Sequence, residues 1–339
     1  MAVIRIEDIA HVRFAAPHQA EMRGFLQDFG FETFEMGGRL YGRGRDGRPF
    51  LHVTEPGKAR FLAVGLRAAS LADLETLARA ERVPVETLDE PGGGQIVRLV
   101  DPDGYQVEVV AGQDVGAPDL SVADPPRNSA TTKPRLRSPV RLKSAPAHIQ
   151  RIGHAVLRVR DFRISEAWYK ERFGFLTSDE VEAAEGVPLG AFLRCDRGEL
   201  PSDHHTLFLA QLPGPPGLLH AAFEVAHLDD LMLGHQHLKA AGHKPAWGVG
   251  RHIMGSQIFD YWLDPFGNEL EHWTDGDLFT AADPPSKQTM QALLAVQWGA
   301  PHPMLAGRFA PPVSLVAFLM ALRLRVLRLF RRKPEGTPA

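Results

Sequence analysis

The chain alternates between strand-like and helix-like patterns of apolar residues, and this alternation predicts an α+β protein. Short runs such as QIVRLV, YQVEVV and HTLFLAQL are β-branched or alternate apolar with polar residues, which is typical of strands. The segments SLADLETLARAE and HLDDLMLGHQHLKAAG instead carry apolar residues at helical spacing. Ser70 is a candidate N-cap for the first of these two helices.

The predicted elements recur in the same order along the chain. An opening strand with an early histidine, His11 or His154, is followed by an amphipathic helix that ends in Phe-Gly-Phe. Each half later reaches a DPxG turn, in LVDPDGYQVEVVAG and in WLDPFGNELEHWTDG, and within each half the strand–helix opening occurs twice. The pattern predicts two related domains, each of two βαβββ modules, with sheets curled around a cavity.

A segment without a strand or helix period separates the two repeats. Residues 112–150 are rich in Pro, Ser and Ala, with an acidic first part and a basic second part, which indicates a surface linker. We therefore expect an N-terminal domain at residues 1–111, a C-terminal domain at residues 151–277 and a C-terminal extension at residues 278–339.

Composition narrows the class of protein. The 339 residues are 44% hydrophobic and 23% charged, as in ordinary soluble globular proteins, and the net charge of −3 gives no reason to expect a nucleic-acid partner. A single cysteine, Cys195, excludes an internal disulfide framework and fits a reducing compartment. The opening MAVIRIEDIAHVRF lacks the basic flank and apolar run of a signal peptide, so we expect a cytoplasmic protein.

The segment GRHIMGSQIFDYWLDPFGNELEHW concentrates groups that bind metals or move protons. Because extended strands place alternate residues on one face, His154, His220 and Glu271 could point into a common cavity. Two imidazoles and one carboxylate on one face of an octahedral metal suit iron(II), since they leave positions open for a chelating substrate and for oxygen. Taken singly, each residue is better explained as an ordinary strand residue, half-buried for the histidines and solvated for the glutamate.

The second half resembles the type I extradiol ring-cleavage dioxygenases of the vicinal oxygen chelate superfamily, a group that includes catechol 2,3-dioxygenase and 2,3-dihydroxybiphenyl dioxygenase. The resemblance is carried by GHAVLRV, HHTLFLA, LLHAAFEV, GRH and DPFG, and it extends from about residue 5 to residue 277. Three intervals are similar to those of the family: fifteen residues from His205 to His220, nine from His252 to Tyr261, and ten from Tyr261 to Glu271.

This resemblance implies an iron(II) enzyme, with manganese(II) as the alternative metal. The implied reaction is cleavage of a catechol-type diol beside its hydroxyls with O2, in the degradation of aromatic compounds. The implied metal ligands are His154, His220 and Glu271. His205 would be the acid–base group, Tyr261 would donate a hydrogen bond to a bound substrate oxygen, and His252 would assist from the same side. We expect a homo-oligomer and a cavity that receives apolar surface from Phe192 and Trp247.

Two departures from the family pattern qualify the resemblance. In the first domain the matching positions are His11, Ala63 and Glu108, so an alanine breaks the triad and we expect that domain to hold no metal. Asp260 stands where the family usually has an apolar residue, which leaves the packing behind Tyr261 open. Two other functions also stay open: a glyoxalase-type isomerase or lyase that uses a different metal, and a non-catalytic ligand-binding protein of the same fold.

The tail PPVSLVAFLMALRLRVLRLFRRKPEGTPA lies outside the resemblance and predicts a basic amphipathic helix from Val313. The apolar face is predicted to carry Leu315, Phe318, Leu319, Leu322, Val326, Leu329 and Phe330. The basic face is predicted to carry Arg325, Arg328, Arg331 and Arg332, with Arg323 at the border. The uncharged run from Val313 to Leu322 is ten residues, whereas spanning a bilayer takes about twenty. Two hypotheses stay open: peripheral contact with the inner membrane surface, or a helix docked on its own protein or on a second subunit.

Overall fold

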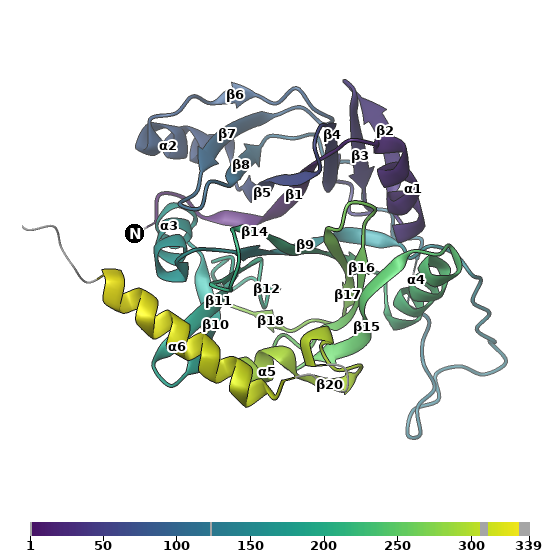
Figure 1. Cartoon of the computed structure of the whole chain (residues 1–339). Helices are drawn as coiled ribbons and strands as arrows, with labels where there is room; N and C mark the ends of the chain where they lie inside the picture. Colours follow the sequence, from purple (N-terminus) through teal and green to yellow (C-terminus); the bar gives the residue numbers. More distant parts are fainter. Residues whose placement is uncertain (1, 123, 306–310, 332–339) are drawn as a thin grey trace, which may run out of the picture.

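The computed structural model describes residues 2–122, 124–305 and 311–331 and contains two large curled sheets, one in each half of the chain (Figure 1). Helices cover the outer faces of both sheets (Figure 1). The predicted fold class, α+β with βαβββ modules and curled sheets, is confirmed.

The first half consists of two βαβββ modules. One runs through β1 (Ile6–Ala16), α1 (Gln19–Phe29), β2 (Glu32–Met36), β3 (Arg39–Arg43) and β4 (His52–Pro56). The other runs through β5 (Arg60–Ala68), α2 (Leu71–Glu81), β6 (Glu86–Thr87), β7 (Gln95–Val100) and β8 (Gln106–Ala111). Ser70 caps α2 as predicted, because its hydroxyl accepts the backbone N–H of Asp73 at 3.2 Å.

The second half repeats this order. Its first module runs through β9 (Ile149–Arg158), α3 (Phe162–Phe173), β10 (Leu176–Ala184), β11 (Val187–Arg194) and β13 (Leu207–Ala210). Its second module runs through β14 (Gly217–Val225), α4 (Leu228–Ala240), β15 (Lys244–His252), β16 (Ile258–Leu263) and β17 (Glu269–Thr274). Two short strands, β12 (Ser202–Asp203) and β18 (Leu278–Phe279), pair with each other outside the main sheet.

The modules of each half join along their first strands. The first sheet has the order β2-β3-β4-β1-β5-β8-β7-β6, in which β1 and β5 are antiparallel. In the second sheet the matching central pair is β9 and β14, also antiparallel, and β14 is parallel to β17 on its other side. Strands β9, β14 and β17 are therefore adjacent at the centre of the second sheet.

The residues after β18 bridge the two edges of the second sheet. Strand β19 (Ser286–Thr289) pairs with β10 at one edge, and β20 (Val296–Gly299) pairs with β15 at the other. Only α5 (Met290–Leu294) and Ala295 lie between these two strands, so the chain crosses the open side of the curled sheet. A turn, η1 (Pro303–Leu305), and helix α6 (Val313–Arg331) follow, and α6 lies against α5 and β10 (Figure 1).

Helix α6 begins at Val313, as the sequence predicts, but a different face packs on the protein. Met320, Ala321 and Leu324 are buried. The apolar residues of the predicted face are exposed where they are described: Leu315, Phe318, Leu319, Leu322 and Val326. The side chains of Leu329, Phe330 and Arg331, and the whole of Arg332, lie outside the described part of the chain. None of the helices in the described ranges has the length and apolar character needed to cross a bilayer.

The two halves share one hydrophobic core. Phe31 of the first half packs edge-on against Phe223 of β14, with the ring centroids 4.8 Å apart. The ring of His272, on β17, donates from Nε2 to the carbonyl oxygen of Phe29 at 2.7 Å. In the same way the Tyr105 hydroxyl donates to the carbonyl oxygen of Arg158 at 2.8 Å. Buried contacts of this kind fix the second sheet on the first.

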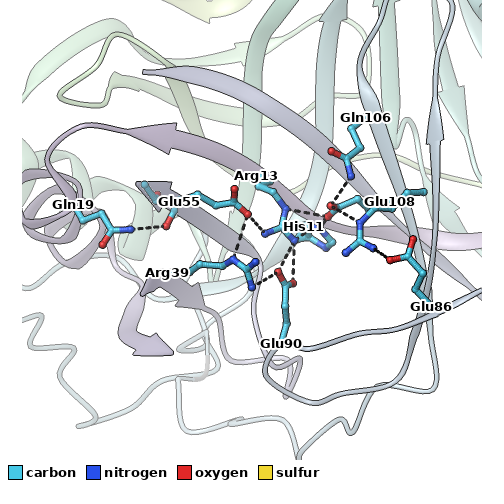
Figure 2. Close-up of polar contacts among 11 residues, drawn as sticks. His11, Arg13, Gln19, Arg39, Glu55, Glu86, Glu90, Gln106 and Glu108 are labelled. Atoms are coloured by element: carbon cyan, nitrogen blue, oxygen red, sulfur yellow. Dashed lines mark hydrogen bonds and ion pairs between the residues drawn. The ribbon is translucent and has the colours of Figure 1, made fainter. Parts of the chain in front are cut away.

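The first sheet buries charged residues on β1 and β8 (Figure 2). They lie at the place where the second sheet carries the expected metal ligands. Strand pairing sets the correspondence: Ala63 pairs with Arg13 across β5 and β1, and His220 pairs with Val156 across β14 and β9. Ala63 therefore takes the place of His220, and Arg13 takes the place of Val156. The first half thus loses an imidazole and gains a guanidinium at this site.

The guanidinium of Arg13 joins two buried carboxylates (Figure 2). Its Nη2 lies 2.9 Å from Glu108 Oε2 and 2.8 Å from Glu90 Oε1, and His11 Nε2 lies 2.6 Å from the same Glu108 oxygen. Burial alone acts to raise the pKa of Glu108, but the hydrogen bond and charge of His11, together with Arg13, lower that pKa to about 2. The stabilisation is therefore present above the ordinary carboxyl pKa and is lost as the pH falls toward 2.

Replacing Arg13 by alanine should destabilise the protein strongly, because Glu108 and Glu90 would remain buried and would lose their nearest guanidinium group. We expect Arg13→Ala to lower the free energy of unfolding by about 3–5 kcal/mol, measured by urea unfolding. The matched control is Arg23→Ala, which removes a surface pair with Glu35 and should cost less than about 1 kcal/mol. Equal effects of the two substitutions would contradict a stabilising role for the buried cluster.

Candidate metal centre

Three adjacent strands bring the predicted metal ligands together. His154 lies on β9, His220 on β14 and Glu271 on β17, and their ligand atoms all lie within 4.8 Å of one another. This is the one group of three metal-binding side chains found among the described residues. The alternation of side chains along a strand explains the grouping, because each of the three residues faces the inside of the curl.

The three side chains fit a divalent cation. Glu271 Oε2 lies 3.2 Å from His154 Nε2 and 3.3 Å from His220 Nε2. The other oxygen, Oε1, is buried and accepts no hydrogen bond within the described part of the chain. A buried carboxylate oxygen without a donor is costly, and a cation between the three groups would satisfy it. Two nitrogens and one carboxylate are also the donor set typical of non-haem iron(II) sites.

Burial holds the histidines in the form that binds metals. It lowers the pKa of His154 to about 3 and that of His220 to about 4, so both imidazoles are neutral near pH 7. Burial also raises the pKa of Glu271 to about 7. Because a ligating carboxylate must be ionised, a bound cation would displace the proton from Glu271 and hold it as an anion.

His205 lies against the metal ligands and is connected to a buried carboxylate. Its ring centroid is 4.0 Å from that of His154, and its Nδ1 is 3.0 Å from Nδ1 of His204. Nε2 of His204 is 2.8 Å from Oδ2 of Asp179. Burial acts to raise the pKa of Asp179, but hydrogen bonds with His204 and Ser286 lower it below its usual value, so the group is a carboxylate near pH 7.

The carboxylate sets the direction of both hydrogen bonds in this series when His204 is neutral. An ionised carboxylate can only accept, so Nε2 of His204 must carry the hydrogen and donate to Asp179. In a neutral His204, Nδ1 is then the acceptor, and Nδ1 of His205 is the donor. Nε2 of His205 is left with a free lone pair. His205 lines the same cavity as His154 and His220, so it presents a proton acceptor there.

Sequence reasoning missed the supporting pair, His204 and Asp179. The side chain of His204 is buried, with 1% of its surface exposed. The adjacent histidines in HHTLFLA were a signal that two imidazoles meet. Nothing in the sequence pattern singles out Asp179, because it reaches His204 only through the pairing of β10 with β11 and of β11 with β13.

Tyr261 and His252 lie on the neighbouring strands β16 and β15. The Tyr261 hydroxyl is 3.0 Å from Nε2 of His252, and its ring is 5.1 Å from that of His220. Burial raises the pKa of Tyr261 well above 10 and lowers the pKa of His252, so both groups are neutral near pH 7. If His252 donates its Nε2 hydrogen to the phenol oxygen, the phenol hydrogen remains for a ligand in the cavity. Trp247 stacks on Tyr261 and orients its ring.

Asp260, which departs from the family pattern, does not disturb Tyr261. Consecutive residues of a strand point to opposite faces, so Asp260 faces helix α4 while Tyr261 faces the cavity. The Asp260 carboxylate is fully buried and accepts from Trp262 Nε1 at 2.6 Å and from His235 Nδ1 at 3.1 Å. His235 of helix α4 and the indole of Trp262 thus supply the hydrogen bonds that this buried carboxylate needs.

One cavity of about 490 Å³ is lined by His154, His220, His205, Tyr261 and His252, and its volume is within the range of roughly 300–1,000 Å³ that is usual for small-molecule sites. Phe192 and Trp247 contribute walls, as the sequence predicts. The residues after β18 add further apolar walls that the sequence did not predict, namely Met290, Leu293, Leu294, Met304, Val316 and Met320. Their position follows from the attachment of β19 and β20 to opposite edges of the sheet.

Comparison with known proteins agrees with this geometry. The model of the Glyoxalase/Bleomycin resistance protein/Dioxygenase superfamily matches residues 151–272. Metapyrocatechase 2 from Cupriavidus necator is 26% identical over 295 residues, which are 81% of this chain and 83% of the relative. Biphenyl-2,3-diol 1,2-dioxygenase from Metapseudomonas furukawaii is 33% identical over 36% of this chain and 40% of its own length. An iron-dependent extradiol dioxygenase from Rhodococcus jostii (strain RHA1) is 27% identical over 38% of this chain and 44% of the relative.

Solved structures share the fold. The Mn(II)-bound glyoxalase from Novosphingobium aromaticivorans aligns with a TM-score of 0.72 and 24% identity, covering 91% of this chain and 96% of that chain. The 2,3-dioxygenase LapB from Pseudomonas sp. KL28 aligns with a TM-score of 0.69 and 18% identity, covering 86% of this chain and 99% of that chain. The group of side chains that could hold a metal ion lies inside the segment that the family model matches. The second half of the chain is therefore a domain of the Glyoxalase/Bleomycin resistance protein/Dioxygenase superfamily.

Proposed function

We propose that this protein is an iron(II)-dependent extradiol dioxygenase that opens a catechol-type ring beside its two hydroxyls with O2. The observation that carries the proposal is a group of two histidines and one carboxylate whose histidines line one cavity together with the proton acceptor His205 and the phenol of Tyr261. The names of the relatives support it, since three of them are called metapyrocatechase, biphenyl-diol dioxygenase and iron-dependent extradiol dioxygenase.

His154, His220 and Glu271 would hold the metal. When bound, iron(II) would supply a Lewis acid for the two diol oxygens and an electron path between the diol and O2. Near pH 7 the three ligands are two neutral imidazoles and one carboxylate, so they neutralise half of the charge of the ion. A diol that has lost a proton would bind such a site more strongly than a neutral diol.

His205 would move the proton of the diol. Its Nε2 lone pair accepts a hydroxyl proton in the first step of the reaction, and the resulting imidazolium can return that proton to an oxygen of the opened ring. The charge that forms on His205 is stabilised through His204 by the carboxylate of Asp179. A buried histidine whose pKa lies well below the usual value accepts a proton reluctantly, so this carboxylate matters for turnover.

Tyr261 and His252 would bind the diol on the side opposite His205. A phenol that remains protonated can donate to a diol oxygen, and His252 fixes the direction of the phenol by its own hydrogen bond. The ring of the substrate would lie against apolar walls such as Phe192, Phe208 and Leu293. A catechol with an apolar substituent therefore suits this cavity better than one with a charged substituent.

The function is tested by metal content and ring cleavage together. Protein purified without air should contain close to one iron per chain, consume O2 and convert an alkyl- or aryl-substituted catechol to the yellow ring-fission product. Iron-loaded, reduced protein that leaves a broad panel of catechols unchanged would contradict the proposal. Selective uptake of zinc or nickel would instead support glyoxalase-type chemistry.

Glu271 and His205 should fail in different ways when each is replaced by alanine. Glu271→Ala should weaken iron binding by more than about 100-fold, because loss of an outer partner of a metal ligand alone costs about 10–100-fold. His205→Ala should keep its iron and lose about 10²–10⁴-fold in kcat. Iron content and single-turnover rates measure the two effects, and loss of iron from His205→Ala would refute its role as a proton acceptor.

Asp179→Asn should reverse the hydrogen bonds that lead to His205. The amide nitrogen of the new side chain can donate to His204, which would leave His205 Nε2 carrying a hydrogen in place of a lone pair. We expect kcat to fall on the order of 10²-fold while the iron content stays unchanged. The pH–kcat profile should also lose the limb that reports the ionisation of the general base, His205. The control is Glu180→Gln, the next residue on β10, which pairs with Arg163 on the other face. If the two variants behave alike, Asp179 does not act through His204.

A further inference from the structure

Helix α6 has two apolar faces, and folding uses one of them. On the inner face, Val316 and Met320 line the cavity, and Met320, Ala321 and Leu324 are buried against the protein. On the other face lies a row that we call the outer stripe, which consists of Leu315, Phe318, Leu319, Leu322 and Val326. Each of these side chains is between 41% and 62% exposed. Their spacing of three or four residues places them along one side of the helix.

Arginines border the outer stripe on both sides. At 3.6 residues per turn, Arg323 and Arg325 lie to either side of the line through Leu322, and both are exposed. Arg328 lies farther round the helix, and its guanidinium reaches the carbonyl oxygen of Gly186 at 3.4 Å. No aspartate or glutamate occurs between residues 313 and 331. The exposed side of α6 is therefore apolar along its centre and positive along its margins, although the whole chain carries a net charge of −3.

We propose that the outer stripe of α6 docks on an anionic lipid surface. Apolar side chains of an interfacial helix enter the acyl boundary, and arginines at its margins extend their guanidinium groups to the lipid phosphates. The arrangement on α6 matches both requirements. The apolar run of the helix is too short to span the bilayer. The helix would therefore lie on the membrane surface, with the rest of the protein packed on its inner face.

Charge favours lipid over a second copy of the chain as the occupant of the outer stripe. In a symmetric pair, the two stripes would face each other and bring Arg323 and Arg325 of both copies together. Helix α6 has no acidic residue to pair with them, so like charges would oppose the association. An anionic membrane instead presents a negative surface that attracts each arginine.

Docking would place the cavity beside the bilayer. Val316 and Met320 form part of the cavity wall on the side of α6 opposite the stripe. Catechols with apolar substituents partition into lipid, so a docked enzyme would meet them at a raised local concentration. This consequence rests on the proposed function, whereas the docking itself does not.

The test is co-sedimentation of the full chain with vesicles of equal parts phosphatidylglycerol and phosphatidylcholine. We expect binding at about 0.1 M salt and little at about 1 M, where the Debye length falls from about 10 Å to about 3 Å. Leu319→Ser/Leu322→Ser removes apolar contact, and Arg323→Gln/Arg325→Gln removes charge. Each pair should weaken binding by about tenfold or more.

Two matched control variants carry the same changes elsewhere. Leu120→Ser/Leu136→Ser replaces two leucines that are 80% and 87% exposed between β8 and β9, and Arg137→Gln/Arg141→Gln replaces two exposed arginines of the same segment. Both controls should bind vesicles as the unaltered protein does. Thermal unfolding midpoints of the α6 variants should be unchanged, because these side chains face solvent.

Several results would overturn the proposal. These are failure of the unaltered protein to bind anionic vesicles, equal binding to pure phosphatidylcholine, or equal weakening by the linker controls. Analytical ultracentrifugation without lipid could give a further contradicting result. If Leu319→Ser/Leu322→Ser formed a smaller assembly than the unaltered protein, the outer stripe would be a subunit interface. Because vesicle binding is measured without substrate, a failure of catechol cleavage would leave its result unaffected.

Discussion

Each curled sheet buries a carboxylate at the same place, and the structure depends on how that charge is neutralised. In the first half the carboxylate is Glu108, and the chain itself supplies the cation through Arg13. In the second half it is Glu271, where the position equivalent to Arg13 is Val156 and two imidazoles stand in reach. A buried carboxylate without a cation is costly, so a cation from outside the chain would stabilise Glu271 as an anion. One substituted pair of positions thus separates a structural ion cluster from a candidate metal centre.

The alternation of side chains along β17 connects that site to the other half of the protein. Glu271 faces the inside of the curled sheet beside His154, and the next residue, His272, faces the opposite way and donates a hydrogen bond to the carbonyl oxygen of Phe29 in the first half. A shift of one residue in the register of β17 would exchange the two side chains and destroy both arrangements. The hydrogen bond to Phe29 and the packing of Phe31 on Phe223 therefore stabilise the register that puts Glu271 beside His154.

Much of the fold could be predicted because its signals are local, and the grouping of His154, His220 and Glu271 could be predicted from the family resemblance. Each βαβββ module repeats within a few dozen residues, and spacing with family resemblance pointed to His154, His220 and Glu271. Contacts between segments that are distant in the sequence could not be predicted. Strand β19 pairs Ser286 with Asp179, and no local pattern predicts that pairing. The same is true of the segment that crosses the cavity and of the hydrogen bond by which Asp179 supports His204 and His205. Helix α6 is apolar on several sides, so periodicity alone could not say which side packs.

The outer side of α6 exposes a row of apolar residues that the fold does not bury. The helix is held by buried residues at its inner face, such as Met320 and Leu324, and this packing would be the same if the outer residues were polar. Exposed leucines elsewhere, such as Leu120 and Leu136, are scattered along an irregular segment and need no special explanation. A continuous apolar row on a rigid helix differs, because it favours association and lowers solubility without adding to the stability of the fold. An exposed row of this kind is what the proposed docking on a lipid surface requires.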